Sequence, residues 1–559
     1  MIPTTKLLAA AALFLTVGTT AHAQWQTTTY SLKGGWNAIN LTGDATYASI
    51  DTLLPTSVIE VWRWNPNPNQ VQFTSSPLLP TEGTPEWDVW KRSGLGSTFS
   101  TLTGPGTFLV KCTGTTANTY SVAIKQSPKV PRTSWVRNGA NLNGFATFKN
   151  GANFPTFANY FTTFPTATAA STKIYKFVGG DLGPNNPLQI FSTTLERVDR
   201  NQGYWFSAEV VGDFTGPVKM SFSNSNALDF GRTRTTVSAS FYNRSAAPVT
   251  LTFTPVNSEV EPALQPAVTG PAPLTRRVFN TTTLSTVDVP ITGAITEVLA
   301  PQATTTVNFG INRAAMTAPA ADALYASLLR VTDSGNLMDV YLPVSAQKGT
   351  LAGLWIGDIS LKGVGSQVAG YTGTATPREF PLRTLLHVSD TGTPRLLSQV
   401  FLGQLAAVGN DSGVCTTEAL LKQDAKANAQ RFVATHMPLN QVITGSGALA
   451  ALPSTVGCTI TIPFNDATNP FVHQYHPDHD NKDARFQPVG AGVESYNIVR
   501  ACTFTFTAVP PVGSTASGWG SSVIGGTYAE TITGIHKNPI TVSGTFELRR
   551  ASEIGTLSQ

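Results

Sequence analysis

The sequence has few charged residues, and after its first 23 positions it has no apolar run long enough to cross a membrane. Charged side chains make up 13% of the 559 residues, where about 25% is usual. The net charge is only +4 and Lys and Arg form no cluster, which argues against nucleic-acid binding. Apolar residues still account for 41% of the chain. We therefore expect folded domains with true hydrophobic cores and no transmembrane segment in the mature chain.

Cysteine is scarce as well. The chain has four, Cys112, Cys415, Cys458 and Cys502, and no two are spaced as a C-x-x-C metal or redox motif. If the chain enters an oxidising compartment, disulfides can form. Cys415–Cys458 is the pairing we favour, and buried free thiols are the alternative.

Familiar catalytic signatures are missing too. The sequence contains no G-x-S-x-G elbow, no H-E-x-x-H, no P-loop and no glycine-rich dinucleotide fingerprint. This absence favours a non-catalytic protein, although it leaves other active-site designs open.

The N-terminus has the three parts of a bacterial signal peptide. Lys6 supplies the positive charge, residues 7–17 are apolar, and an Ala-His-Ala sequence ends at Ala23. The apolar part is shorter than the roughly 20 residues that span a bilayer. We expect cleavage after residues 1–23 and a secreted, periplasmic or cell-surface protein.

Two stretches of about equal length follow, residues 24–127 and 128–224, and they share landmarks. Each begins with a Trp/Asn/Gly-rich segment, continues with an alternating strand, and closes with a glycine before an apolar run. The corresponding segments are residues 32–41 and 134–145, 58–64 and 173–177, and 106–110 and 203–206. This spacing predicts two tandem small β-domains, because alternation with a period of two is typical of half-buried strands.

Residues 225–347 contain short β-branched strands between turn residues, a pattern typical of an antiparallel sandwich. The order of an Asp-Phe-Gly sequence ending at Gly231, a strand, Asn243 and a second strand resembles the immunoglobulin-like domains of the group related to abnormal-spindle and hydin proteins. The resemblance implies a spacer or binding module and brings no catalytic residues.

Residues 351–552 contain the clearest strands. Residues 380–388 and 395–402 form a predicted hairpin around a Ser-Asp-Thr-Gly turn, and only residues 417–434 have the composition of a helix. We expect an antiparallel barrel or a sandwich. The whole chain is thus predicted to be all-β: tandem small β-domains, an immunoglobulin-like sandwich and this C-terminal domain.

One loop in the last domain concentrates potential metal ligands. Its histidines and carboxylates suit zinc, and its Asp-x-Asp spacing suits calcium. The residues are His473, His476, Asp478, His479, Asp480 and Asp483. The alternative is a turn-rich loop in which these side chains cap backbone amides.

A second candidate site is aromatic. Trp62 and Trp64 share one face of a predicted strand, with Trp87, Asp88 and Trp90 nearby in sequence. Flat indole rings beside a carboxylate could hold sugars. The alternative, which we favour, is that these rings fill the core of a small β-domain.

Two functions remain open at this point. The first is a non-catalytic β-module protein for adhesion, matrix structure or glycan binding, whose partner is an extracellular glycan or surface polymer and which requires no cofactor. The second is a metal-dependent hydrolase or lyase acting on an extracellular polymer, with its site in the loop at residues 473–483. A ligand-carrying barrel is a third reading of residues 351–552.

Overall fold

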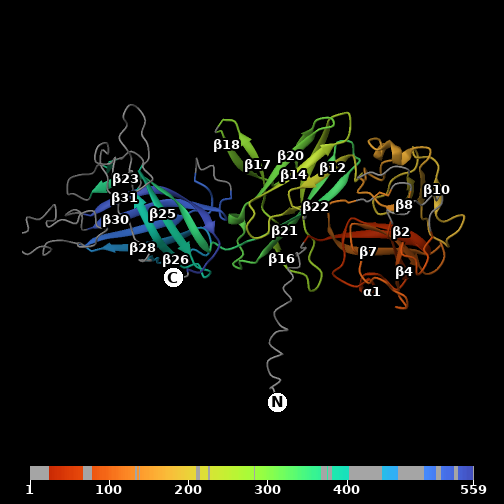
Figure 1. The fold of residues 1–559 in the computed structure, drawn as a ribbon, viewed down its shortest axis with the longest axis horizontal. Coiled ribbons are helices and arrows are strands. Elements are labelled where there is room, and N and C mark those ends of the chain that lie inside the picture. The colour runs from red at the N-terminus through yellow and green to blue at the C-terminus, as the bar shows by residue number, and fades with distance from the viewer. Residues whose placement is uncertain are drawn as a thin grey trace, which may run out of the picture. The chain divides into compact units, whose positions relative to one another are not determined.

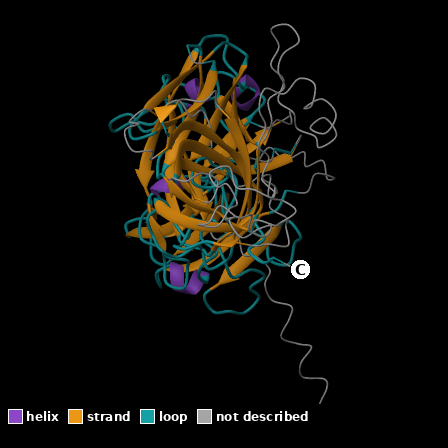
Figure 2. Ribbon diagram, turned by 90° about the vertical axis from the view of Figure 1, so that its left-hand side faces the viewer, coloured by secondary structure: helices purple, strands orange, loops and turns teal. Residues whose placement is uncertain are grey.

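The structure is a computed structural model, and almost all of its regular elements are strands (Figure 2). It describes residues 24–66, 79–132, 135–136, 139–208, 214–224, 227–282, 284–366, 374–375, 380–401, 443–463, 497–511, 518–533 and 539–557. The all-β prediction is confirmed. Within these ranges the α-helices are single turns, α1 (Ile50–Leu53) and α2 (Phe157–Tyr160). The helix predicted at residues 417–434 lies outside the described residues.

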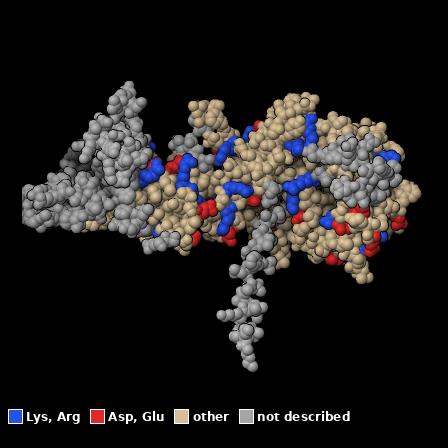
Figure 3. Space-filling view, viewed as in Figure 1, with Lys and Arg blue, Asp and Glu red and all other residues tan. Residues whose placement is uncertain are grey.

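Contacts divide the chain into two compact units. The first comprises Met1–Arg276, Val289–Phe309 and Ala323–Gln347, and the second comprises Arg277–Asp288, Gly310–Asp322 and Lys348–Gln559. On the face shown in Figure 3, acidic and basic residues are scattered among uncharged ones. No helix among the described residues is long and apolar enough to cross a membrane.

The first unit begins with a four-stranded antiparallel sheet packed on a three-stranded one (Figure 1). Their shared core holds Tyr30, Phe108 and Val122. The larger sheet has the order β2 (Gly35–Leu41), β6 (Gly106–Cys112), β4 (Val58–Trp64), β5 (Trp87–Lys91). The smaller has the order β1 (Gln26–Lys33), β7 (Thr119–Pro128), β3 (Gly43–Asp44).

A second four-stranded sheet follows in the same unit, and it has the same strand order as the first. Its order is β8 (Gly139–Asn143), β11 (Tyr204–Ala208), β9 (Lys173–Lys176), β10 (Leu188–Ile190). An aromatic core that includes Trp135, Phe161 and Phe206 fills one side of it, together with α2 and the 3-10 turn η1 (Pro165–Thr168).

The first strand of each sheet is anchored by an asparagine at the matching place. In β2, Asn37 accepts a hydrogen bond from Lys33 N at 2.9 Å and donates one to Lys33 O at 2.8 Å. In β8, Asn141 does the same with Val136, at 2.6 Å and 3.1 Å. Because a side-chain amide both accepts and donates, it can hold the turn that leads into the strand.

Two facing sheets form the next part of the chain, as expected for a sandwich. Phe253 lies between the sheets, with its ring centroid 5.2 Å from that of Phe241 and 5.9 Å from that of Phe309. One sheet has the order β12 (Val218–Phe222), β14 (Thr236–Asn243), β20 (Thr304–Ile311), β17 (Leu274–Asn280), β18 (Ser285–Pro290). The other has the order β13 (Leu228–Asp229), β22 (Asp339–Gln347), β21 (Leu324–Asp333), β15 (Val249–Asn257), β19 (Ile295–Leu299), with β16 (Val268–Gly270) beside β21.

The second unit contains a nearly closed antiparallel barrel, so of the two predicted forms the structure has the barrel. Two backbone hydrogen bonds of 2.7 Å and 3.1 Å join Ser446, two residues after the first strand ends, to Gly457 of the last strand. The strand order is β27 (Ile443–Thr444), β26 (Pro394–Phe401), β25 (Phe380–Val388), β23 (Gly353–Ser366), β31 (Ile540–Ser552), β30 (Val523–Thr533), β29 (Ile498–Phe506), β28 (Ser454–Ile462), and β24 (Thr374–Ala375) pairs with β23.

Alternating side chains fill the barrel. Along β29, every second residue from Ile498 to Phe506 is buried, which is the pattern that a strand with one face inward requires. Most of the interior is apolar. Inside it, Arg500 pairs with Glu530, and the Tyr528 hydroxyl donates a hydrogen bond of 2.7 Å to the same carboxylate.

Candidate functional site

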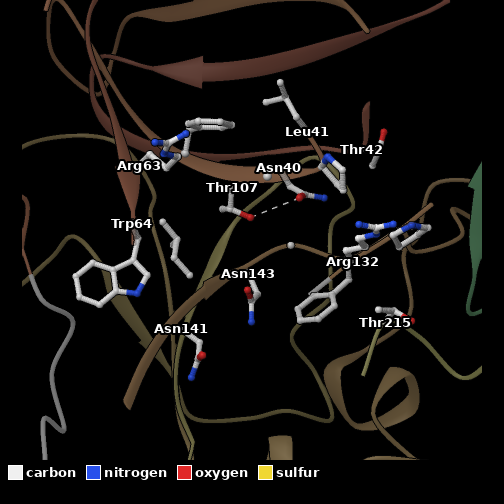
Figure 4. Close-up of a pocket in the computed structure, with 18 of the residues that line it drawn as sticks. Asn40, Leu41, Thr42, Arg63, Trp64, Thr107, Arg132, Asn141, Asn143 and Thr215 are labelled. Carbon is white, nitrogen blue, oxygen red and sulfur yellow. Dashed lines mark hydrogen bonds between the residues drawn. The ribbon is translucent and has the colours of Figure 1, made fainter. Parts of the chain in front are cut away.

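A cavity of about 330 Å³ lies in the first unit where its two four-stranded sheets meet (Figure 4). One wall comes from β2, β4 and β6, and the other comes from β8 and the residues that follow it. The lining residues are Asn40, Leu41, Thr42, Arg63, Trp64, Pro66, Thr103, Pro105, Gly106, Thr107, Phe108, Pro131, Arg132, Asn141, Leu142, Asn143, Gly144, Phe145, Ala146 and Thr215.

Asn40 is fixed between the two sheets. Its backbone N–H donates to Asn201 O at 3.0 Å, and its side-chain Nδ2 donates to Arg200 O at 2.9 Å. Opposite it, Gly144 leaves the room that this arrangement needs, because a Cβ at Gly144 would lie 2.1 Å from Asn40 Cγ. Thr107 Oγ1 lies 3.5 Å from Asn40 Oδ1. The cavity wall is therefore set by tight packing rather than by mobile side chains.

The two arginines of the lining lie on opposite sides of the cavity, with Asn40, Thr107 and Asn143 between them (Figure 4). Arg63 is paired across strands with Asp88, and its Nη2 lies 2.6 Å from Asp88 Oδ2. Arg132 is exposed, and it makes no hydrogen bond or ion pair with the described parts of the chain. Within the described part of the chain, the Arg63 guanidinium is thus fixed and that of Arg132 is free to bind a ligand.

Asp88 acts behind the wall rather than in the cavity. Burial by itself would raise the pKa of this carboxyl, but hydrogen bonds from Asn65 and Arg63 outweigh it and lower the pKa. Asn65 Nδ2 donates to Asp88 Oδ2 at 2.7 Å. The carboxylate therefore stays ionised at neutral pH and balances the Arg63 charge.

A second hydrogen-bond donor at the cavity also lacks a partner among the residues that the structure describes. Asn143 Nδ2 is buried, and none of the described residues accepts a hydrogen bond from it. A buried amide without an acceptor costs free energy, typically about 1–3 kcal/mol. Together with Arg132, Asn143 makes the cavity rich in donors and suited to a ligand that offers oxygen acceptors.

The described lining residues include no Asp, Glu, His, Cys, Lys or Tyr. The cavity can therefore donate hydrogen bonds, accept them at amide and hydroxyl oxygens, and supply positive charge. Among the described lining residues there is no side chain of the kind that acts as a general base near neutral pH.

The four tryptophans of the predicted sugar platform are buried, with exposed fractions of 4% for Trp62, 7% for Trp64, 5% for Trp87 and 3% for Trp90. Such burial speaks against an exposed platform and favours the packing interpretation. The Trp64 and Trp87 ring centroids are 5.0 Å apart, and Trp205 of the second sheet stacks on Trp87 at 6.2 Å. Only Trp64 of the four is among the described residues that line the cavity.

The remaining predicted site residues are placed only in part. His473, His476, Asp478, His479, Asp480 and Asp483 lie outside the described residues, as does Cys415. The described strands on either side of this loop are β28 and β29. Cys458, the other half of the predicted Cys415–Cys458 pair, is a buried free thiol here. Among the described residues, no three His, Cys, Asp or Glu side chains are grouped closely enough to hold a metal ion.

Sequence reasoning did not select the polar residues of the cavity. Asn40 and Asn143 lie in segments that served as repeat landmarks, and their shared asparagine content was the available signal. For Arg132 and Thr107 the sequence carries no such signal, because no pattern along the chain indicates that these two residues lie close together.

Comparisons with known proteins add little to this geometry. No family model and no curated protein matches the chain. A crystal structure from Bacteroides ovatus, described as a structural-genomics protein of unknown function, aligns over 60% of this chain and 95% of its own, with 9% sequence identity and a TM-score of 0.18. A score this low supports no argument about function. The relation of residues 225–347 to hydin-type domains stays a prediction.

Proposed function

We propose that this chain is an exported, non-catalytic β-module protein, and that its first two modules bind an oxygen-rich ligand such as a segment of an extracellular glycan. The observation that carries the proposal is the cavity between the two four-stranded sheets, with donors at Arg132 and Asn143 that have no partner among the described residues. Its volume of about 330 Å³ lies near the lower end of small-molecule sites, roughly 300–1,000 Å³.

The character of the lining supports a saccharide more than an apolar ligand. Amide and hydroxyl side chains at Asn40, Thr107 and Asn143 can each exchange hydrogen bonds with sugar hydroxyls. Phe108 and Leu142 add apolar surface against which C–H groups can pack. Arg132 suits a carboxylate-bearing sugar, because a guanidinium binds carboxylates through two parallel hydrogen bonds.

The localisation belongs to the proposal and rests on the sequence. Lys6, the apolar residues 7–17 and the Ala-His-Ala site before Gln24 support export. In this view the repeat pair serves as the ligand-binding part. The identical strand order of its two sheets supports an origin by duplication.

A glycan array probed with the full-length mature protein tests the proposal. The panel contains neutral and uronic-acid-containing oligosaccharides, and hits are titrated by calorimetry. Arg132→Ala removes a charged hydrogen-bond donor, which is worth about 1.5–3 kcal/mol and lowers affinity roughly 10- to 100-fold. Asn143→Ala lowers it by a smaller factor.

Arg232→Ala is the matched control, because Arg232 is also exposed, has no partner among the described residues and does not line the cavity. It should bind like the wild type. Equal affinity of the wild type and Arg132→Ala for every hit, or no hit in the panel, would rule out a glycan site in this cavity.

A further inference from the structure

Two thiols face each other inside the barrel. Strands β28 and β29 are antiparallel neighbours, and their register places Cys458 directly opposite Cys502. Both side chains are buried, with exposed fractions of 3% and 2%, and both belong to the same hydrophobic core.

The backbone hydrogen bonds define the type of this pair. Gly457 exchanges both of its backbone hydrogen bonds with Ser446, so the N–H and C=O of Cys458 point the other way, towards β29. The two cysteines therefore form a hydrogen-bonded pair, in which Cα atoms are about 5.5 Å apart. Disulfide-bonded cysteines most often have Cα atoms roughly 5.5–6 Å apart, with Cβ atoms about 3.5–4.5 Å apart. In a hydrogen-bonded pair the Cβ atoms lie towards the wide end of about 4.5–5.5 Å, so the two strands must draw together slightly for the bond to form.

We propose that Cys458 and Cys502 form a cross-strand disulfide when the protein folds in an oxidising compartment. This assignment is an alternative to the Cys415–Cys458 pairing that we favour from the sequence. It is independent of ligand binding in the first unit. It depends on the barrel register and on access to an oxidant.

The chemistry is a two-step thiol–disulfide exchange with an oxidant that itself carries a disulfide, either a protein oxidoreductase or oxidised glutathione. One cysteine thiolate attacks a sulfur of the oxidant, which forms a mixed disulfide and releases one oxidant thiolate. The second cysteine thiolate attacks the protein sulfur of that mixed disulfide, forms the Cys458–Cys502 bond and releases the other oxidant thiolate. The two thiol protons pass to the released thiolates, so the cysteines lose two electrons and the oxidant gains them.

The fold also determines when the bond can form. Burial raises the pKa of the Cys458 thiol to about 11 and that of the Cys502 thiol to about 12. The nearby Glu530 carboxylate also raises the pKa of Cys502, and the contact of 3.1 Å between Cys502 Sγ and the Tyr528 hydroxyl only partly offsets these effects. Because the reactive species is an accessible thiolate, neither cysteine of the completed barrel reacts readily. The disulfide must therefore form before the barrel closes over these two side chains.

The experiment compares full-length protein produced in an oxidising compartment with protein produced in a reducing cytoplasm. Free thiols are alkylated on lysis, and unreduced digests are mapped by mass spectrometry. We expect a linked peptide pair containing Cys458 and Cys502 only in the first sample, with Cys112 alkylated after denaturation in both. Folded, reduced protein incubated with oxidised glutathione should stay reduced.

Two variants separate the disulfide from ordinary packing effects. Cys502→Ala abolishes the link, and oxidised wild type should melt roughly 4–16 °C above reduced wild type, while the two Cys502→Ala preparations melt together. Cys112→Ala, which also removes a buried thiol, keeps the link. Alkylation of both Cys458 and Cys502 in the oxidising sample, or a Cys415–Cys458 link there, would overturn the proposal.

Discussion

The barrel contains two ion pairs of the same geometry on opposite faces of its wall. Comparing their contributions to stability therefore measures the effect of burial on an ion pair. Arg500 and Glu530 lie inside, with side-chain exposures of 3% and 1%. Arg383 and Asp358 lie outside, with exposures of 42% and 41%. In both pairs the Arg Nε and Nη2 donate to separate carboxylate oxygens, and Nη2 donates at 3.1 Å.

Glu530→Gln keeps the size of the side chain but leaves the Arg500 charge buried without its counter-ion. Breaking a buried pair in this way costs about 3–5 kcal/mol of unfolding free energy. Asp358→Asn removes the outer pair in the same manner and costs about 0–1 kcal/mol, since water solvates the freed guanidinium. For a domain of this size, the inner change lowers the melting temperature by roughly 6–20 °C.

Differential scanning calorimetry of the full chain measures both variants, and the transition expected to shift is that of the second unit, which contains the barrel. A third variant, Arg500→Met with Glu530→Leu, should recover most of the stability lost in Glu530→Gln, because an apolar pair needs no compensation of charge. Equal losses for Glu530→Gln and Asp358→Asn would refute the argument from burial.

Three further predictions concern the first unit. Gly144→Ala places a methyl group against the fixed Asn40 side chain. It should lower the free energy of unfolding, measured by chemical denaturation, by about 1–3 kcal/mol and should also weaken ligand binding. A variant as stable as the wild type would contradict the tight packing. The pKa of Asp88 is lowered on folding, so its stabilisation is present above about pH 4, the usual value for Asp, and is lost as the pH falls through the folded-state pKa. Asp88→Asn should therefore be less stable than the wild type at pH 7, and the difference in unfolding free energy should shrink in acid; a difference that grows in acid would show that the sign is wrong. Because no carboxylate or imidazole lines the described cavity, EDTA should leave its ligand affinity unchanged in calorimetry, whereas a metal held by residues 473–483 would appear in elemental analysis of the untreated protein and disappear after chelation.

Much of the local structure could be predicted from the sequence. The predicted strands around Trp62, Phe108 and Phe504 are strands in the structure, because alternating apolar residues must face one side of a sheet. The hairpin near residues 380–402 is also present, as β25 and β26. The boundaries of the four predicted domains, the duplication and the loop at residues 473–483 stay predictions.

The candidate site could not be predicted in the same way. Trp62 and Trp64 are conspicuous along the chain, and their period-two spacing places them on one face, but whether that face meets water or another sheet depends on residues far away. In the structure, Trp205 from the second sheet packs against Trp64, with ring centroids 5.1 Å apart, and Trp62 belongs to the same buried cluster.

The sequence by itself thus determined that the chain is built of strands. The alternation of apolar and polar residues, and the turn residues between strands, are local patterns that extend over only a few positions. Only the tertiary structure decided which faces are buried and which polar groups meet. Asn40 and Asn143 line one cavity, and Cys458 faces Cys502, because sheet packing and strand register join residues that are distant in the chain. Those contacts depend on how whole sheets pair and pack, and no short stretch of sequence records them.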